Sequence, residues 1–461
     1  MNFSAYGQDT WKATPRLTLA YGLRWEVNTP PTDRRGNDAF TVLGLNDPAT
    51  MTLAPFGSPL WKTTYDNFAP RIGVAYQLSQ AKGRETVLRG GFGIFYDVGT
   101  GPTFDGVQGF TVPYFRSQTF QTFPFDFNQI SIPPVNFNPS PPYDSLWVFD
   151  PNLKLPRTYE WNVSAERSLG SNQTMTASYV GAAGRRLLRK EVLRGPSLPN
   201  PNFTRVVVTR NAATSDYDAL QLQFQRRLSR GLQALASYTW SHSIDIASAD
   251  STLNISTTKI DPKIDRGSSD FDVRHSFSAA ATYDVPKLSL NHFAERLLRN
   301  WSVDAIFRAR TATPLTVIVN RALFGVKATG TRVDLVSGVP VYLRNSSVAG
   351  GWRLNPAAFA TPPAGRQGTL GRNSVRGFPL SQLDFSFRRK FTLSERFNLQ
   401  LRADLFNAFN HPNFGAPEGL LSDPLFGQST KMLGRELGAG LSPLYQIGGP
   451  RSIQLALKLQ F

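Results

Sequence analysis

The chain has no cysteine among its 461 residues, which excludes disulfide bonds and thiolate metal sites. It also lacks any apolar run near the roughly 20 residues that a transmembrane helix needs. The opening stretch, MNFSAYGQDTWK, has neither the basic segment nor the apolar core of a secretory signal and resembles the middle of a strand. A membrane barrel is not excluded, because alternating strands average out in any hydropathy window.

Signals for catalysis are scarce. The four histidines are too far apart in sequence to suggest a zinc motif; they are His242, His275, His292 and His411. Ser241, His242 and Asp245 lie close together, but no nucleophile elbow surrounds them, and triads are defined by geometry. The segment RGGFGIFYDVGTG lacks the lysine of a P-loop, so its glycines are expected to relieve crowding in a curved strand. We therefore expect no enzyme activity, cofactor or metal.

One loop concentrates acidic residues. The segment IDPKIDRGSSDFD contains four aspartates, which are Asp261, Asp265, Asp270 and Asp272. Clustered oxygens suit calcium, yet the spacing does not match an EF-hand. A solvated acidic loop is the favoured interpretation, and a calcium site is the alternative.

The net charge of +17 suits an anionic partner. Basic residues are spread along the chain rather than clustered, which argues against nucleic acid. Several fall in segments expected at one end of the strands: Arg34, Arg35, Arg185, Arg186, Arg189, Lys190 and Arg194. Neutralisation of lipid phosphates is preferred for this group over substrate capture.

Two-residue alternation runs through the whole chain. In the last segment, RSIQLALKLQF, the apolar positions are Ile453, Leu455, Leu457, Leu459 and Phe461. Successive strand side chains point to opposite faces, so such a segment has one apolar and one polar face. The same pattern predicts about thirteen strands, near 2–11, 17–27, 68–78, 86–96, 158–169, 173–180, 217–228, 232–241, 274–285, 301–310, 382–393, 397–405 and 453–461.

The connections alternate between short and long. Short links include 13–16, 170–172, 229–231 and 394–396, whereas long segments cover 28–67, 97–157, 181–216, 242–273, 311–381 and 410–450. Short turns at one rim and long loops at the other are typical of outer-membrane barrels. The long segment 102–157 is rich in phenylalanine and proline; its aromatics either contact a sugar or peptide ligand or pack as a loop core.

Large aromatic residues fall at the predicted strand ends, on the apolar face. Those expected at the outer ends are Trp25, Tyr96, Tyr159, Trp161, Tyr238 and Trp240. Those expected at the inner ends are Trp11, Tyr76, Tyr283, Trp301 and Phe461. Two belts of amphipathic rings are what the two membrane interfaces select. Tyr21, in mid-strand, departs from the pattern, and Trp61, Trp147 and Trp352 lie in long loops.

The polar face carries too little apolar volume for a dry core and predicts a wide lumen that holds water or a plug. The predicted fold is therefore an all-β, transmembrane antiparallel β-barrel in the outer membrane, with residues 1–461 as one domain. A soluble β-rich binding domain is the alternative, and the aromatic belts argue against it.

Several segments also resemble a known family. YGQDTWKATPRLTLAYGLRWE, PRIGVAYQL, VLRGGFGIFYD, DYDALQLQFQRRLSRGLQALASYTWSHSID and RADLFNAFNHPNFG are similar to the barrel of TonB-dependent outer-membrane receptors, in particular the Oar-like branch. The family's barrel has 22 strands around a plug. The resemblance implies that this chain is the C-terminal part of a barrel, with about nine strands, the plug, a TonB box and a signal peptide absent.

The resemblance implies energised uptake of a large scarce solute, with the TonB complex as partner only through the missing plug. A surface binding or adhesion protein anchored by the same barrel is the alternative. The expected environment is outer-membrane lipid and lipopolysaccharide. The terminal apolar residues Ile453 to Phe461 match the family's signal to the barrel assembly machinery. The substrate is not predicted.

Overall fold

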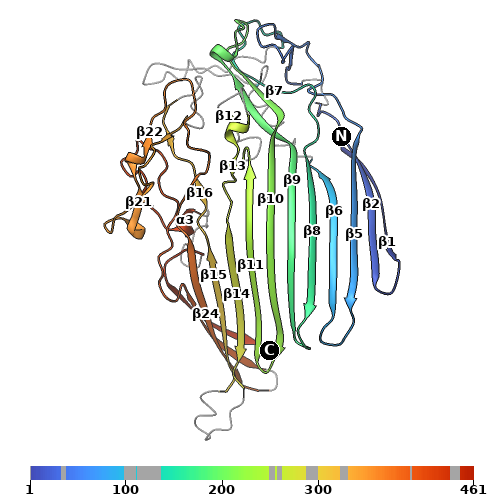
Figure 1. Cartoon of the computed structure of the whole chain (residues 1–461), viewed down its shortest axis with the longest axis vertical. Coiled ribbons are helices and arrows are strands. Elements are labelled where there is room, and N and C mark those ends of the chain that lie inside the picture. Colours follow the sequence, from blue (N-terminus) through green and yellow to red (C-terminus); the bar gives the residue numbers. More distant parts are fainter. Residues whose placement is uncertain are drawn as a thin grey trace.

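The computed structural model describes residues 2–32, 38–97, 111, 137–248, 255–256, 262–286, 299–321, 331–394, 397–436 and 447–460. One large antiparallel sheet dominates it, and thirteen long strands follow one another in sequence order across this sheet (Figure 1). The strands are β1 (Asn2–Lys12), β2 (Leu17–Asn28), β5 (Asn67–Ser79), β6 (Thr86–Tyr96), β8 (Arg157–Ser168), β9 (Gln173–Leu193), β10 (Val206–Ser229), β11 (Leu232–Asp245), β14 (His275–Asp284), β15 (Trp301–Arg310), β24 (Leu380–Thr392), β25 (Asn398–Phe406) and β26 (Ser452–Gln460).

All thirteen predicted strands are confirmed, as is the alternation of short and long connections. The expectation of a loop over 181–216 is wrong. Strands β9 and β10, with 21 and 24 residues, continue through most of it as a hairpin beyond their neighbours (Figure 1). Short strands from other loops pair with this long hairpin. Strand β7 (Leu146–Phe149) pairs with β10, and β12 (Ile255–Ser256) pairs with β9.

The strand register places most apolar residues of the thirteen strands on one face. Trp25 lies opposite Phe68 in the first strands, and Leu401 lies opposite Leu457 in the last. The polar residues of each strand share the other face. A mainly apolar face across a sheet of this width is the surface that a barrel turns toward lipid.

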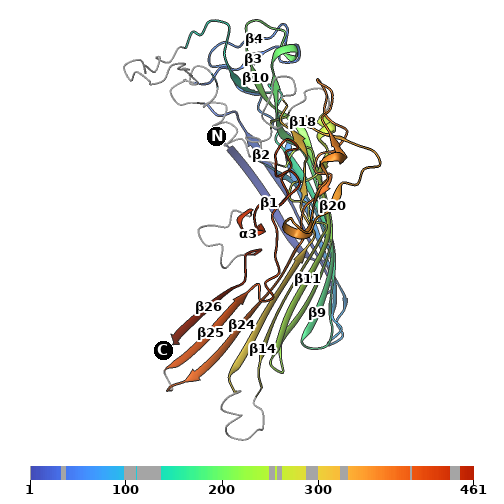
Figure 2. The same ribbon diagram turned by 90° about the vertical axis from the view of Figure 1, so that its left-hand side faces the viewer.

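The sheet is curved and open. In Figure 2 the first strands and β24–β26 bend toward the same side, and the short helix α3 (Leu433–Glu436) lies on that concave side. The concave face carries the polar residues and is called the lumen wall below. Within the described ranges, β1 and β26 each pair with a single strand. No helix in the described part of the chain is long and apolar enough to cross a membrane.

The long connections pack into two compact regions above the sheet. One has a core of Phe40, Met51, Leu146, Leu193, Val206 and neighbouring apolar residues, and Trp61 packs on Phe149 beside it. The other is built around Val317, Val333, Leu354, Phe359 and Phe426. Their short strands are β3 (Val42–Leu43), β4 (Thr52–Leu53), β13 (Gly267–Ser268), β16 (Pro314–Leu315), β17 (Ile318–Val319), β18 (Thr331–Arg332), β19 (Asp334–Leu335), β20 (Tyr342–Arg344), β21 (Trp352–Leu354), β22 (Phe359–Ala360) and β23 (Val375–Arg376).

The expected role of the glycine-rich segment is supported by its geometry. A Cβ atom at Gly93 would lie 2.9 Å from the Phe95 ring, and one at Gly91 would lie 3.3 Å from the Asn162 side chain. Glycine at these two positions of β6 leaves room for the Phe95 ring of the same strand and for the Asn162 side chain of β8.

The turn between β10 and β11 depends on glycine for two separate reasons. Arg230 and Gly231 both have positive φ, 52° and 77°, as a two-residue hairpin turn requires. A Cβ at Gly231 would also lie 2.4 Å from the carbonyl oxygen of Asp284 in the next strand. At Gly170, with φ of 78°, a Cβ would meet nothing within 4 Å.

This contrast gives a matched pair of variants. Gly170→Ala introduces only backbone strain, whereas Gly231→Ala adds a steric clash, so Gly231→Ala should be more destabilising, by about 1–3 kcal/mol. The measurement is the temperature at which the folded, heat-modifiable gel band of the protein extracted from the outer membrane disappears. Equal shifts for the two variants would show that contact with Asp284 has no effect.

The open edges generate a second prediction. Strands β1 and β26 present unpaired backbone groups, and each such group in hydrocarbon costs several kcal/mol. The 461-residue chain expressed alone should therefore aggregate in detergent unless further strands are supplied. Size-exclusion chromatography with a heat-modifiability assay tests this, and a monodisperse, heat-modifiable product would contradict it.

Candidate functional site

The lumen wall carries a cluster of paired charges where β15, β24 and β25 lie side by side. The register aligns Asp304 with Ser386 and Ser386 with Asp404, so these three side chains form one row across the strands. The next row toward the outer rim contains Asp384 opposite Ile306. Strand pairing alone therefore gathers three carboxylates on one small area of the polar face.

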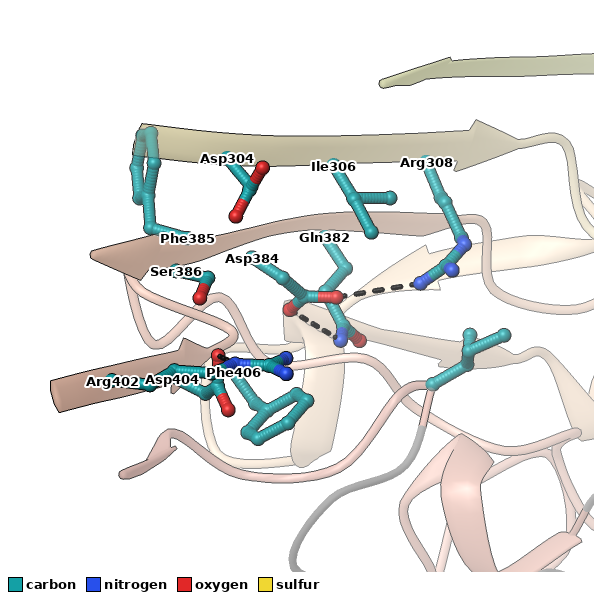
Figure 3. Close-up of a pocket in the computed structure, with 11 residues that line it drawn as sticks. Asp304, Ile306, Arg308, Gln382, Asp384, Phe385, Ser386, Arg402, Asp404 and Phe406 are labelled. Carbon is teal, nitrogen blue, oxygen red and sulfur yellow. Dashed lines mark hydrogen bonds and ion pairs between the residues drawn. The ribbon is translucent and has the colours of Figure 1, made fainter. Parts of the chain in front are cut away.

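Each carboxylate in this cluster has an arginine partner. Asp304 accepts two hydrogen bonds from Arg388, at 2.6 and 2.8 Å. Arg402 Nε donates to Asp404 at 2.8 Å. The Arg308 guanidinium lies 3.3 Å from Asp384. Figure 3 shows Arg308, Asp384 and Arg402 converging on a common space.

That space is a cavity of about 250 Å³. Its lining residues are Asp304, Ile306, Arg308, Gln382, Asp384, Phe385, Ser386, Arg402, Asp404, Phe406 and Ile447. Ser386 is 8% exposed, and its buried hydroxyl has no hydrogen-bond partner in the described part of the chain. A buried polar atom without a partner is uncommon in native structures, which singles this cavity out on the lumen wall.

The sequence pattern did not single out these residues as a site. The alternation placed Gln, Asp, Ser and Arg on the polar face of the predicted segments 382–393 and 397–405, but alternation does not set the register between strands. The repeated Asp and Arg on neighbouring polar faces was the available signal, since opposite charges across strands stabilise a sheet.

The predicted interface aromatics that the structure describes lie on the apolar face of the sheet. At the outer ends, Trp161 lies opposite Phe92 and Trp240 opposite Leu220. At the inner ends, Trp11 lies opposite Leu19 and Tyr76 opposite Leu17. Their contact with the membrane interfaces stays a prediction. Tyr21, the exception, donates a hydrogen bond to Asp9 on the neighbouring strand at 3.2 Å.

The expected assembly signal forms the apolar face of β26. Ile453, Leu455, Leu457 and Leu459 are exposed there and oppose apolar residues of β25. Phe461 lies outside the described residues. The placement fits a lipid-facing strand, and recognition by the assembly machinery stays a prediction.

In the described part of the acidic loop, Asp265 and Asp272 are buried in arginine ion pairs rather than solvated, whereas the Asp270 side chain is 64% exposed. Buried Asp265 accepts hydrogen bonds from Arg189 and Arg332, both at 2.6 Å. Asp272 accepts one from Arg376 at 2.5 Å and another from the backbone N–H of Ser243 at 2.8 Å. No acidic cluster among the described residues could hold a metal ion. Asp261 lies outside those residues.

Asp272 anchors this network electrostatically. Burial would raise the pKa of its carboxyl group, but hydrogen bonds from Arg376, the Ser243 N–H and His242, with the charge of Arg376, hold that pKa below its usual value. The carboxylate therefore stays ionised and joins the 311–381 segment to the end of β11.

Two of the expected outer cations are buried. Arg189 is paired with Asp265, and Lys190 lies over the Trp147 ring with its Nζ atom 4.4 Å from the ring centroid. They are therefore not available to lipid phosphates, contrary to our expectation. Arg185 pairs with Asp216 at 2.6 Å, while Arg34 and Arg35 lie outside the described residues. Contact of Arg185, Arg186 and Arg194 with lipid stays a prediction.

The serine, histidine and tryptophan residues that the sequence also singled out make structural contacts in the described part of the chain. Ser241 donates its hydroxyl hydrogen bond to the Val273 carbonyl, and His242 contacts Asp272, so these residues form no triad with Asp245. His275 contacts the Tyr238 hydroxyl at 2.8 Å. Trp352 stacks on Phe378 with ring centroids 4.1 Å apart. His292 and the phenylalanines of the 102–136 segment lie outside the described residues.

Comparisons with known proteins agree with this architecture. A family model described as "Outer membrane beta barrel domain" matches residues 1–454. The chain belongs to this family and is an outer-membrane protein. No curated protein matches its sequence.

Solved structures share the fold at low sequence identity. The outer-membrane transporter YddB from Escherichia coli is 10% identical with a TM-score of 0.52, and the match covers 100% of this chain and 45% of that one. The FrpB iron transporter from Neisseria meningitidis is 11% identical with a TM-score of 0.47, with 100% and 45% covered. This chain thus spans less than half the length of each of these proteins. The likeness to receptor barrels expected from the sequence is confirmed.

The ion-pair network yields a prediction with an internal control. Asp272→Asn leaves Arg376 and Arg274 without their buried partner and should destabilise the outer loops by about 3 kcal/mol. Asp270→Asn removes a pair whose carboxylate is 64% exposed and should cost less than about 1 kcal/mol. Trypsin cleavage of the loops on intact cells, combined with the thermal loss of the folded gel band, measures both.

The same network should weaken in acid. Because the folded pKa of Asp272 is lowered, its contribution is present above the pKa of an unfolded aspartate, about 3.9, and is lost as the pH falls through the folded value. Wild-type loops should therefore become protease-sensitive while they are held in acid, measured with a protease that is active at low pH. Equal sensitivity of Asp272→Asn and Asp270→Asn at neutral pH would contradict this assignment.

Proposed function

We propose that this chain forms part of the barrel wall of a TonB-dependent outer-membrane receptor that takes up a large scarce solute. The observation that carries the proposal is the combination of a mainly apolar outer face with a lumen wall lined by paired charges. A wall of thirteen strands contributes to a barrel too wide for its own side chains to fill. Such a lumen has room for a plug and for a passing solute.

The packed outer loops support a receptor. The two compact loop regions are held by apolar cores and by the Asp265 and Asp272 ion pairs, so they present shaped surfaces to the outside. Preorganised loops lose little conformational entropy on binding, which favours capture of a dilute solute. Energy for release would reach the receptor from TonB through a plug, and this wall would hold that plug.

An uptake experiment in the source bacterium tests the proposal. A strain without the gene, the same strain with the gene restored, and the wild type are supplied with a dilute mixture of large solutes, and depletion is followed by mass spectrometry. At least one solute should be depleted at least about tenfold faster when the gene is present. A protonophore should abolish that difference, because no energy source exists in the outer membrane itself.

Two outcomes would contradict energised transport. Gene-dependent uptake that survives the protonophore would indicate a passive pore. Gene-dependent binding to the cell surface without uptake would favour the adhesion protein. Sequencing the DNA upstream of the Met1 codon adds an independent test, since a TonB box in frame with this chain is expected only for the energised receptor.

A further inference from the structure

The lumen cavity between β15, β24 and β25 has a defined boundary. The segment 447–449 crosses its outer side, where the Gly448 N–H donates to Gln382 Oε1 at 2.7 Å. Asn407 holds the same segment through a 2.9 Å hydrogen bond to the Gly449 carbonyl. Ile447 from this segment and Phe406 from β25 add apolar surface to the lining of the cavity. Hydrogen bonds therefore hold the 447–449 segment in place as one wall of the cavity.

The charges at this site cancel. Asp304 pairs with Arg388, Asp384 with Arg308, and Asp404 with Arg402. Three carboxylates and three guanidinium groups leave no net charge to attract an ion. A single bound cation or anion would enter a partly desolvated space without a compensating charge, which is unfavourable. A neutral ligand avoids this cost.

Hydrogen-bonding capacity remains at the site after these pairs are made. No described residue bonds to the Ser386 hydroxyl, to the second carboxylate oxygen of Asp404, or to the two terminal nitrogens of Arg402. The carboxylate oxygen accepts, the guanidinium nitrogens donate, and the hydroxyl does both. All three residues line the cavity (Figure 3).

We propose that this cavity binds one ring of a neutral, polyhydroxylated solute, that is, a sugar residue. Each sugar hydroxyl both donates and accepts, so neighbouring hydroxyls satisfy Arg402 together with Asp404 and Ser386 without adding charge. The C–H face of the ring covers Phe406. The volume of about 250 Å³ lies below the range for drug-sized ligands, about 300–1,000 Å³, and suits a single ring. The proposal rests on the proposed transport function and gives it a substrate class.

Binding is tested on the product of the complete gene, purified from the outer membrane in detergent. Saturation-transfer NMR is recorded with the methyl glycosides of glucose, galactose, mannose and xylose as probes. At least one glycoside should bind saturably. Loss of one hydrogen bond in Ser386→Ala should weaken that binding about fivefold, and Arg402→Ala about tenfold or more. Gln400→Ala is the matched control, because Gln400 lies on the same strand face but does not line the cavity.

The heat-modifiable gel band first confirms that each variant is folded. The proposal is overturned if no glycoside binds, if Ser386→Ala and Arg402→Ala bind as Gln400→Ala does, or if equimolar sulfate or methylammonium displaces the probe. Because binding in detergent needs no energy source, the result is separate from the uptake experiment. A receptor that takes up another solute and ignores all four glycosides would retain the proposed function and lose this inference.

Discussion

The structure depends on one constraint: a backbone in hydrocarbon must satisfy every N–H and C=O group without water. An antiparallel ladder does this between strands, and thirteen consecutive strands of this chain are joined in one such ladder. Once the ladder sets the backbone, side chains alternate by geometry alone. One face becomes apolar and the other polar, and the aromatic residues, the lumen charges and the loop layout are all arranged relative to these two faces.

Local pattern was enough to predict the strands. The alternation of Leu399, Leu401 and Leu405 with polar neighbours marked β25, and the same reasoning marked the twelve other strands. The hairpin extension of β9 and β10 was not predictable in this way. Residues such as Arg189 and Lys190 break the alternation, because they are buried against loops from distant parts of the chain. Their structure is stabilised by contacts far away in sequence, which a local pattern does not contain.

The candidate site, too, was predictable from the sequence only in part. The polar face of β24 and β25 was predicted, and Asp384, Ser386, Arg402 and Asp404 all lie on it. Which carboxylate meets which arginine depends on strand register and on side-chain conformation. The unpartnered Ser386 hydroxyl becomes apparent only when three strands and the 447–449 segment are placed together. Likewise, the sequence of the acidic loop shows its aspartates but not the arginines that pair with them, since Arg332 and Arg376 come from a different connection.

The long β9–β10 hairpin has a mechanical consequence. Its ladder is regular except near Ala213, where two register shifts fall beside Arg186, a residue with φ of 58°. Beyond this point the strands are bound to β7 and to a packed loop core, and before it they belong to the wall. The bend of the hairpin is therefore located at this irregularity, because a β-bulge bends the strand that carries it. The outer end of the hairpin, with β7 and the loop core packed on it, therefore forms one unit that meets the wall at this irregular point.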